Sequence, residues 1–127
     1  MATVTPHVNQ IKLHAGMPGS DPHGLVSFCQ QQSTFVQAYR PLAHGEGLLL
    51  RDETVKAIGR VHGKSAAQVA LRWVLQLGHA LVTSTEKVSH MVGDLNVFDW
   101  ELSLAEMTQL SLLDTSPDSI VSEMCVL

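Results

Sequence analysis

The sequence predicts an α/β domain built on parallel strands. Three short runs with β-branched or aromatic residues alternate with segments whose apolar residues recur at helical spacing. Strands that are separated by helices run parallel, because each crossover returns the chain to the same edge of the sheet. With 127 residues, the chain is long enough for one domain with a hydrophobic core and too short to expect two.

The first part of the chain is expected to hold two strands and one helix. Residues 7–11, HVNQI, are predicted to be the first strand, and residues 35–39, FVQAY, the second. Between them a helix is expected, with Asp21 as its N-cap and Pro22 as its first residue. The residues of this helix that follow helical spacing are Leu25, Phe28, Cys29 and Gln32.

Two successive helices are predicted in the middle of the chain. The first covers residues 51–63 and ends at Gly63. The second begins at an S-x-x-Q capping box formed by Ser65 and Gln68, and it ends at Gly78. Their apolar stripes consist of Val55, Ile58 and the stem of His62 in the first helix, and of Val69, Trp73 and Leu77 in the second.

The last part is expected to hold one strand and two helices. ALVT, residues 80–83, is the third predicted strand, and residues 86–95 form the next helix. Ser103 and Glu106 make a capping box that opens the final helix. The apolar residues of these two helices are Val88, Met91, Val92 and Leu95, followed by Met107, Leu110 and Leu113. The domain is therefore expected to cover residues 1–114, and residues 115–127 form a tail without a pattern that runs over the surface.

Composition excludes several classes of function. The formal net charge is −4, the pI is about 5.9, and no run of Lys or Arg occurs, which argues against nucleic acid and anionic membranes as partners. No apolar stretch approaches the roughly 18 residues of a membrane span, and the N-terminus does not read as a signal peptide. Cys29 and Cys125 lie far apart and are expected to stay reduced, which indicates a cytoplasmic protein.

The common metal-binding, catalytic and nucleotide-binding motifs do not identify a function either. The seven histidines show no HxH, HxxxH or HExxH spacing, so no metal site is predicted. GxSxG, Walker A and GxGxxG are all absent. Cys29 lies on the apolar stripe of a predicted helix and is interpreted as a small core residue. Taken alone, these patterns establish an α/β domain and leave its activity open.

Six short segments follow one another along the chain in a specific order. They are P-x-V-N-Q at 6–10, L-V-S-F-C at 25–29, A-Y-R-P-L-A-x-G at 38–45, G-K-S-A-A-Q-V-A-L-R-W at 63–73, S-T-E-K-V-S-H-M at 84–91 and N-V-F-D-W-E-L-S at 96–103. In this order they resemble the C-terminal part of an aldo-keto reductase, an NADPH-dependent oxidoreductase with an eight-stranded (β/α) barrel. The resemblance implies a partial (β/α)8 TIM barrel made of the last three β/α units, strands six to eight and the helices that follow.

The resemblance implies that the end of the strand 35–39 contacts the cofactor. Residues at the C-terminal ends of barrel strands line the active-site mouth. Tyr39 would stack its ring on the nicotinamide, and the loop 40–47, with Leu42, would lie along the pyrophosphate. Arg40 stands where the family usually has serine, and an arginine can pair with phosphate. Without the resemblance, the preferred interpretation of Tyr39 is a core residue that ends a strand.

Five more residues at the cofactor and its clamp follow from the same resemblance. Gln10 would bond the nicotinamide carboxamide, because an amide both donates and accepts; otherwise it is a solvent-exposed residue at a strand end. Ser84 and Thr85 stand where the family has lysine and serine, and His90 stands where it has arginine. The two cations that grip the adenosine 2′-phosphate are thus absent. Asp94 lies where the family holds the adenine. NADPH is the expected cofactor, with a weakened clamp, and NADH is possible.

No catalytic residue is expected in this chain. In the resembled family, the catalytic Asp, Tyr, Lys and His come from the first half of the barrel, and the chain's single tyrosine is Tyr39. The implied function is NAD(P)-dependent reduction of a carbonyl to an alcohol, for which this chain supplies only the cofactor wall. It would meet a small carbonyl substrate only when the missing half is supplied. The alternatives are a non-catalytic interaction or dinucleotide-binding module and an inactive remnant, and exposed strand edges would pair with a second copy or a full-length relative.

Overall fold

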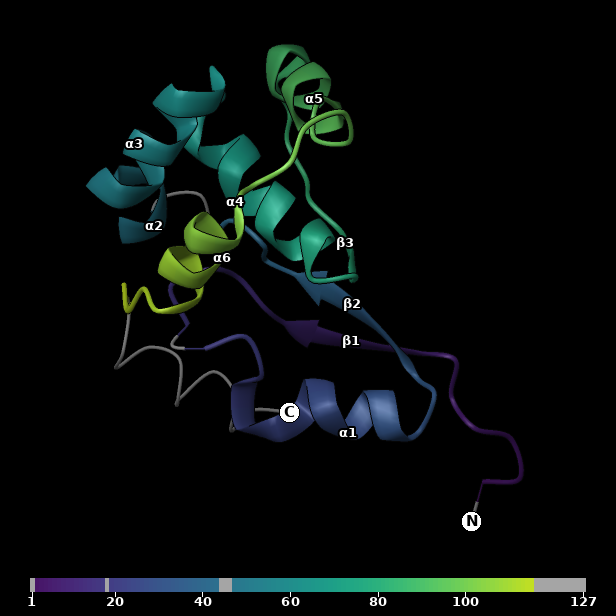
Figure 1. The fold of residues 1–127 in the computed structure, drawn as a ribbon. Coiled ribbons are helices and arrows are strands. Elements are labelled where there is room, and N and C mark those ends of the chain that lie inside the picture. Colours follow the sequence, from purple (N-terminus) through teal and green to yellow (C-terminus); the bar gives the residue numbers. More distant parts are fainter. Residues whose placement is uncertain (1, 18, 44–46, 116–127) are drawn as a thin grey trace.

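Three parallel strands run side by side through the middle of the structure (Figure 1). The computed structural model describes residues 2–17, 19–43 and 47–115. Strands β1 (Val8–Lys12), β2 (Phe35–Tyr39) and β3 (Ala80–Leu81) lie in the order β1-β2-β3. The predicted α/β class is therefore confirmed, and neighbours in sequence are neighbours in the sheet.

Strand boundaries match the sequence prediction to different degrees. The strand 35–39 is confirmed, and the first strand is shifted by one residue from 7–11. The third was predicted too long at 80–83, because only Ala80 and Leu81 pair as a strand. The amide of Val82 still donates to the carbonyl of Ala38 at 2.9 Å, and the chain then leaves the sheet.

Side chains of the sheet alternate between a packed face and a more exposed one, as the pleat requires. Ile11, Val36 and Ala38 are buried against the helices in one hydrophobic cluster. On the opposite face, Val8 and Phe35 are each 52% exposed. Lys12 lies at the carboxyl end of that face and is buried. Only part of the second face is therefore covered.

The first helix begins later than predicted. Residues Pro22–Gly24 form a short 3-10 turn, η1, in which His23 has a φ of 52° and Gly24 a φ of 71°. These left-handed residues separate Pro22 from helix α1 (Leu25–Gln31). The predicted N-cap Asp21 and first residue Pro22 therefore belong to η1, and the N-cap of α1 is Gly24. The Asp21 carboxylate still accepts from the amide of Val26, in the first turn of α1, at 2.7 Å.

In the view of Figure 1, α1 lies below the strands and most other helices gather above them. Of the predicted apolar face of α1, Cys29 is buried, as expected, and Phe28 is 59% exposed, contrary to the prediction. The spacing of apolar residues predicted a helix correctly, but it did not show which side of the helix is buried. The buried side holds Val26 and Cys29, which join the hydrophobic core.

A short helix that was not predicted, α2 (Leu48–Arg51), precedes α3 (Glu53–His62). The predicted helix 51–63 is divided because Asp52 takes an extended conformation. Its carboxylate accepts from the amide of Thr54 at 2.8 Å and so begins α3. Gly63 ends this helix with a left-handed φ of 64°, as predicted.

Helices α4 (Ala66–Gln76) and α6 (Leu104–Ser111) begin at the two predicted capping boxes. In each box the serine hydroxyl accepts from the third helical amide and that residue's side chain accepts from the serine amide. Trp73 is fully buried in α4, and its indole N–H donates to the Ser111 hydroxyl at 3.1 Å. The two helices are therefore joined by a partly buried hydrogen bond.

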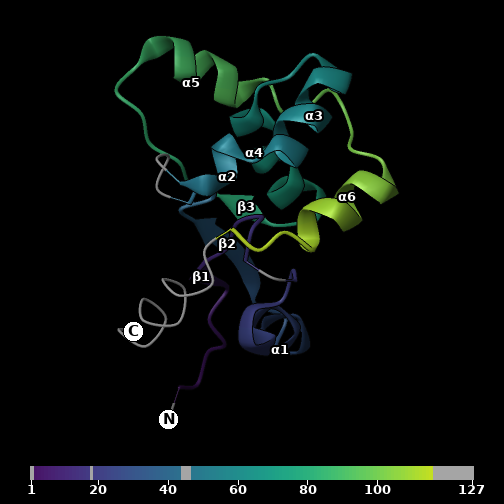
Figure 2. The ribbon, with the colours of Figure 1, turned by 90° about the vertical axis from the view of Figure 1, so that its left-hand side faces the viewer.

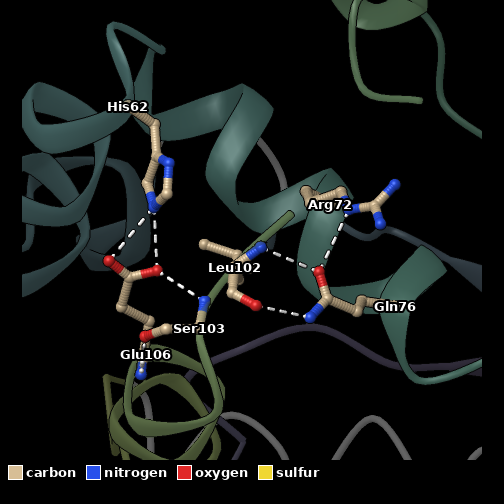
Figure 3. Close-up of polar contacts among 6 residues, drawn as sticks. All are labelled: His62, Arg72, Gln76, Leu102, Ser103 and Glu106. Atoms are coloured by element: carbon tan, nitrogen blue, oxygen red, sulfur yellow. Dashed lines mark hydrogen bonds and ion pairs between the residues drawn. The ribbon is translucent and has the colours of Figure 1, made fainter. Parts of the chain in front are cut away.

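Gln76 fixes the segment that precedes α6 to α4 (Figure 3). Its side-chain amide donates to the carbonyl of Leu102 at 2.7 Å and accepts from the amide of the same residue at 2.9 Å. Arg72 donates to the Gln76 carbonyl oxygen at 3.1 Å and to the carbonyl of Val97 at 3.0 Å. These hydrogen bonds hold the irregular segment before α6 against α4.

Helix α5 (Val88–Leu95) is present as predicted and lies apart from the sheet at the top of Figure 1. Its apolar stripe was expected to be a packed face, but every residue of it is exposed. Val88 and Leu95 are each 72% exposed, and Met91 and Val92 are 47% and 64% exposed. The periodicity correctly predicted a helix, whereas the apolar stripe of this helix is not covered by any of the described residues.

The last described residues return to the loop after β1. The amide of Thr115 donates to the carbonyl of Gly16 at 3.1 Å, and Thr115 is buried. Thr115 is the first residue of the predicted tail, and this hydrogen bond joins it to the loop after β1. The remainder of the predicted tail, residues 116–127, lies outside the described residues.

Candidate functional site

A cavity of about 460 Å³ lies at the carboxyl ends of β2 and β3. Its lining comes from the two segments that directly follow these strands, namely Tyr39, Arg40, Pro41, Leu42, Val82, Thr83 and Ser84. Parallel strands direct their carboxyl ends to one edge of the sheet, so segments that are far apart in sequence meet there. The cavity is large enough for a small ligand.

The turn after β2 shapes one wall of the cavity. Tyr39 ends the strand and is half-buried. Arg40 and Ala43 have positive φ angles of 53° and 52°, which are uncommon for residues other than glycine. The amide of Ala43 donates to the carbonyl of Arg40 at 3.0 Å and closes the turn. Leu42 lies within this turn and lines the same cavity as Tyr39.

The second wall is the segment that leaves β3. The hydrogen bond from the Val82 amide to Ala38 keeps this segment beside β2. Thr83 and Ser84 are exposed and contribute hydroxyl groups. The cavity thus combines one aromatic ring, one guanidinium, two hydroxyls and an apolar floor, which suits a ligand with a flat ring and an anionic group.

Four of the predicted cofactor residues therefore meet in one place: Tyr39, Arg40, Leu42 and Ser84. Pro41 belongs to the loop 40–47 that was expected to lie along the cofactor, whereas Val82 and Thr83 were not predicted as lining residues. Their position at the carboxyl end of a predicted parallel strand was the available signal, since such positions face the same edge of the sheet.

Gln10 lies on the same face of the sheet as Tyr39 but does not line the cavity. The register pairs Gln10 with Gln37, two residues before Tyr39 on β2. The side-chain amide of Gln10 donates to the Gln37 amide oxygen at 2.9 Å. Gln10 therefore lies two residues further from the carboxyl ends of the strands than Tyr39 does.

The remaining predicted residues, Thr85, His90 and Asp94, also lie outside the cavity lining. The Thr85 hydroxyl accepts from the amide of Lys87 at 3.2 Å, directly before α5. His90 and Asp94 are four residues apart on α5. Burial raises the pKa of the Asp94 carboxyl, and the charge of His90 partly offsets this effect. The structure places these three residues around α5.

A second cavity of about 460 Å³, which the sequence did not predict, lies between the N-terminal segment and α1. It is lined by residues 2–6 together with Val8, Asn9, Phe28, Cys29, Gln32 and Thr34. The side-chain amide of Asn9 donates to the Cys29 sulfur at 3.4 Å. Residues 2–6 carry no periodic pattern, and for this reason the sequence did not indicate a wall there.

Within residues 2–17, 19–43 and 47–115, no helix is long and apolar enough to cross a membrane. No group of three or more His, Cys, Asp or Glu side chains there is arranged to hold a metal ion.

Successive parallel β/α units with a cavity at the carboxyl ends of the strands are typical of β/α enzymes. The model of the aldo/keto reductase family matches residues 1–114, and the chain belongs to this family. It is 38% identical over 112 residues to an aldo-keto reductase of Mycobacterium avium, covering 87% of this chain and 37% of the relative. It is also 30% identical over 115 residues to aldose reductase B of Dictyostelium discoideum, covering 91% and 36%.

Solved structures agree with this assignment. The aldose reductase of Schistosoma japonicum superimposes with a TM-score of 0.80 at 31% identity, over 91% of this chain and 36% of that one. A mutant of Gox0644 in complex with NADPH gives a TM-score of 0.79 at 30% identity, over 90% and 40%. The predicted relationship to the (β/α)-barrel aldo-keto reductases is confirmed. The chain spans little more than a third of the length of its curated relatives.

Proposed function

We propose that the chain forms one wall of the cofactor site of an NAD(P)-dependent oxidoreductase that reduces a carbonyl to an alcohol. It would correspond to strands six to eight of the barrel and the helices that follow, with a domain that covers residues 1–114. Family membership and the order of three adjacent parallel strands support this assignment. The observation that carries the proposal is the cavity in which Tyr39, Arg40 and Ser84 converge at the carboxyl ends of the strands.

The side chains present fit a nicotinamide dinucleotide. The cofactor supplies the hydride when bound. Tyr39 offers a flat, half-exposed ring that fixes the orientation of another ring at low entropic cost. Arg40 and the hydroxyl of Ser84 suit phosphate oxygens, and Leu42 adds apolar surface to the same cavity.

The other predicted contacts belong to the same proposal. Gln10 would reach the carboxamide after exchanging its hydrogen bond with Gln37. Thr85, His90 and Asp94 would surround the adenosine, because they lie near or on α5, which follows the cavity wall in sequence. Ser84 and His90 occupy the positions of the family's two cations, so the grip on a 2′-phosphate would be weak and NADH would also be accepted.

The acid–base residues are proposed to lie outside this chain, in the part of the relatives that it does not span. The chain alone would then bind cofactor without turning over a carbonyl, and it would act on substrate only with that part supplied. The reduced, buried Cys29 fits the cytoplasm as its location.

A second candidate is a non-catalytic module or inactive remnant that binds a second copy or a full-length relative. The exposed side chains of Val8 and Phe35 on the sheet favour it, as does the exposed apolar stripe of α5. In this case the cavity would bind no cofactor, and association with another chain would be the function of the protein.

Calorimetric titration with NADPH and NADH tests the first proposal. Replacing Tyr39 with Ala should weaken binding by about tenfold, since aromatic stacking contributes about 1 kcal/mol beyond the area it buries. Tyr39→Phe keeps the ring and should bind nearly as tightly as the wild type. If neither cofactor binds, or if Tyr39→Ala binds as well as the wild type, the cofactor-wall proposal is wrong and the second candidate gains support.

A further inference from the structure

We infer that the second cavity, between the N-terminal segment and α1, binds a neutral planar molecule that carries an amide-type polar group. This site is separate from the proposed cofactor wall. It lies at the amino ends of β1 and β2, since its lining includes Val8, the first residue of β1, and Thr34, which directly precedes β2. The cofactor cavity lies at the carboxyl ends of the strands, and no described residue lines both cavities.

Hydrogen bonds hold the two walls of this cavity together. The Thr34 hydroxyl donates to the carbonyl of Pro6 at 2.9 Å, and the amide of Phe35 donates to the carbonyl of His7 at 2.7 Å. The amide of Thr34 donates to the carbonyl of Cys29 at 2.8 Å. Thr34 therefore joins the N-terminal segment to the end of α1. In Figure 1 both lie at the right-hand side of the sheet, where α1 ends and β2 begins.

The apolar part of the lining centres on Phe28. This ring is 59% exposed, although it belongs to the apolar stripe that the sequence predicted for α1. Val4 and Val8, which line the same cavity, are 69% and 52% exposed. An apolar ring that covers these side chains removes their surface from water and packs against an aromatic face. A flat ligand would therefore bury the side chains that the described chain leaves exposed at this cavity.

The polar part of the lining consists of neutral groups. The side-chain amide of Asn9 donates to the Cys29 sulfur at 3.4 Å, and this is its one hydrogen bond within the described part of the chain. Because an amide has two N–H donors and a carbonyl acceptor, Asn9 keeps one donor and its acceptor for a ligand. Gln32 lines the cavity one helical turn after Phe28 and offers a second amide. Two groups that both donate and accept suit a ligand amide, which does the same.

Charge separates this cavity from the cofactor cavity. None of its described lining residues is ionic, whereas the cofactor cavity contains Arg40. An anion that left water for the second cavity would lose its hydration without gaining a cation. The lining therefore favours a neutral aryl amide over an aryl carboxylate of the same shape, and over a nucleotide.

The probes for this site are 2-naphthamide and 2-naphthoate, which share one ring system and differ in the charge of one group. Titration of the full 127-residue chain, followed by 1H–15N correlation spectra, measures both Kd values. The amide should bind about tenfold more tightly than the carboxylate. It should shift the signals of residues 2–9 and 28–34, which form and adjoin the lining. Saturating NADH should leave its Kd unchanged, because the two cavities share no described lining residue.

Two pairs of variants assign the probe to this cavity. Phe28→Ser removes the exposed ring and should weaken 2-naphthamide binding about tenfold. Phe98→Ser removes a ring that is 68% exposed outside the lining, and it should have no effect. Gln32→Lys adds the cation that the lining lacks and should tighten 2-naphthoate binding. Gln30→Lys adds the same charge on α1 outside the lining and should leave both Kd values as in the wild type.

Four results overturn the inference. Absence of 2-naphthamide binding does so directly and leaves the proposed cofactor wall unaffected. Equal Kd values for the two probes would show that the lining does not select by charge. Equal effects of Phe28→Ser and Phe98→Ser, or displacement of the probe by NADH, would place the probe elsewhere. Should Phe28→Ser not fold, the lysine variants still decide, because equal 2-naphthoate binding by Gln32→Lys and Gln30→Lys contradicts the site.

Discussion

His62 and Glu106 join the end of α3 to the first turn of α6 through a short contact (Figure 3). The Nε2–H of His62 donates to a carboxylate oxygen of Glu106 at 2.8 Å. The same oxygen accepts from the amide of Ser103 at 2.8 Å and completes the capping box of α6. One carboxylate thus begins a helix and attaches it to its neighbour. Burial raises the pKa of Glu106, but the hydrogen bonds from Ser103 and His62 outweigh this effect and the pKa is lowered.

This contact predicts acid sensitivity. Because the folded-state pKa of Glu106 lies below that of the unfolded chain, its contribution to stability is present above the unfolded value and is lost as pH falls through the folded one. Glu106→Gln should lower the free energy of unfolding by about 1 kcal/mol at pH 7 and flatten its decline on acidification. Urea denaturation at several pH values measures both. Glu53→Gln, at an exposed pair with Lys56, is the control and should change little.

The turn at Gly16 predicts a second effect on stability. Gly16 has a φ of 94°, and an added Cβ would collide with the hydroxyl oxygen of Thr115. Gly19 has a similar φ of 85°, but an added Cβ there meets no atom within 4 Å. Alanine at either site bears the backbone strain, whereas only Gly16→Ala also displaces Thr115. We expect Gly16→Ala to cost roughly 1–3 kcal/mol more than Gly19→Ala in thermal or urea unfolding. Equal losses would show that the Gly16–Thr115 approach is not tight.

Sequence and structure agree where a local pattern decides the outcome. The capping boxes at Ser65 and Ser103 began helices as predicted, because their hydrogen bonds lie within four residues. Tyr39 and Ser84 met in one cavity because the carboxyl ends of parallel strands share an edge.

Features that depend on distant partners were not predictable in this way. Phe28 and Leu95 lie on correctly predicted helices, but helical spacing does not show what covers a face. Likewise, Gln10 belonged to a predicted strand end, and only the register placed it opposite Gln37 and outside the cavity. The division between α2 and α3 depends on the extended conformation of Asp52, which periodicity does not reveal.

Cofactor selectivity gives a further prediction. If Ser84 and His90 occupy the positions of the family's two cations, as proposed, the Kd values for NADH and NADPH should lie within about tenfold, a gap of ~1.4 kcal/mol. The double variant Ser84→Lys and His90→Arg should tighten NADPH binding and leave NADH binding nearly unchanged. Fluorescence titration measures both. A strong preference of the wild type for NADPH would mean that another cation, such as the exposed Lys87, holds the 2′-phosphate.

Catalysis by the isolated chain is expected to be absent. If the general acid lies outside these 127 residues, NADPH- or NADH-dependent reduction of aldehydes should not exceed background. The assay follows cofactor absorbance with a panel of aldehydes at neutral pH. Addition of a fragment that carries the first part of a related barrel should restore turnover if the two pieces assemble. Turnover by the chain alone that survives Tyr39→Phe would place the chemistry on residues that have not been considered.

The exposed face of the sheet predicts association. Val8 and Phe35 pair across β1 and β2 and are each 52% exposed, and Val82 beside β3 is 40% exposed. In a closed barrel such side chains would lie against the remaining strands, and each buried apolar side chain contributes roughly 1.5–3 kcal/mol. Since a domain is stable by only ~5–15 kcal/mol, the isolated chain should either associate through this face or unfold without a sharp transition.

Light scattering after size-exclusion chromatography, at several concentrations, tests this association together with thermal melting. Phe35→Ser combined with Val8→Thr should increase the monomer fraction, because it removes exposed apolar area without touching the packed face. Leu104→Ser is the matched control, since Leu104 is 85% exposed on α6, away from the sheet. It should leave the association unchanged if the sheet face is the interface. A compact wild-type monomer with a cooperative transition at all concentrations would contradict the prediction, because the half-exposed sheet would then be stable without a partner.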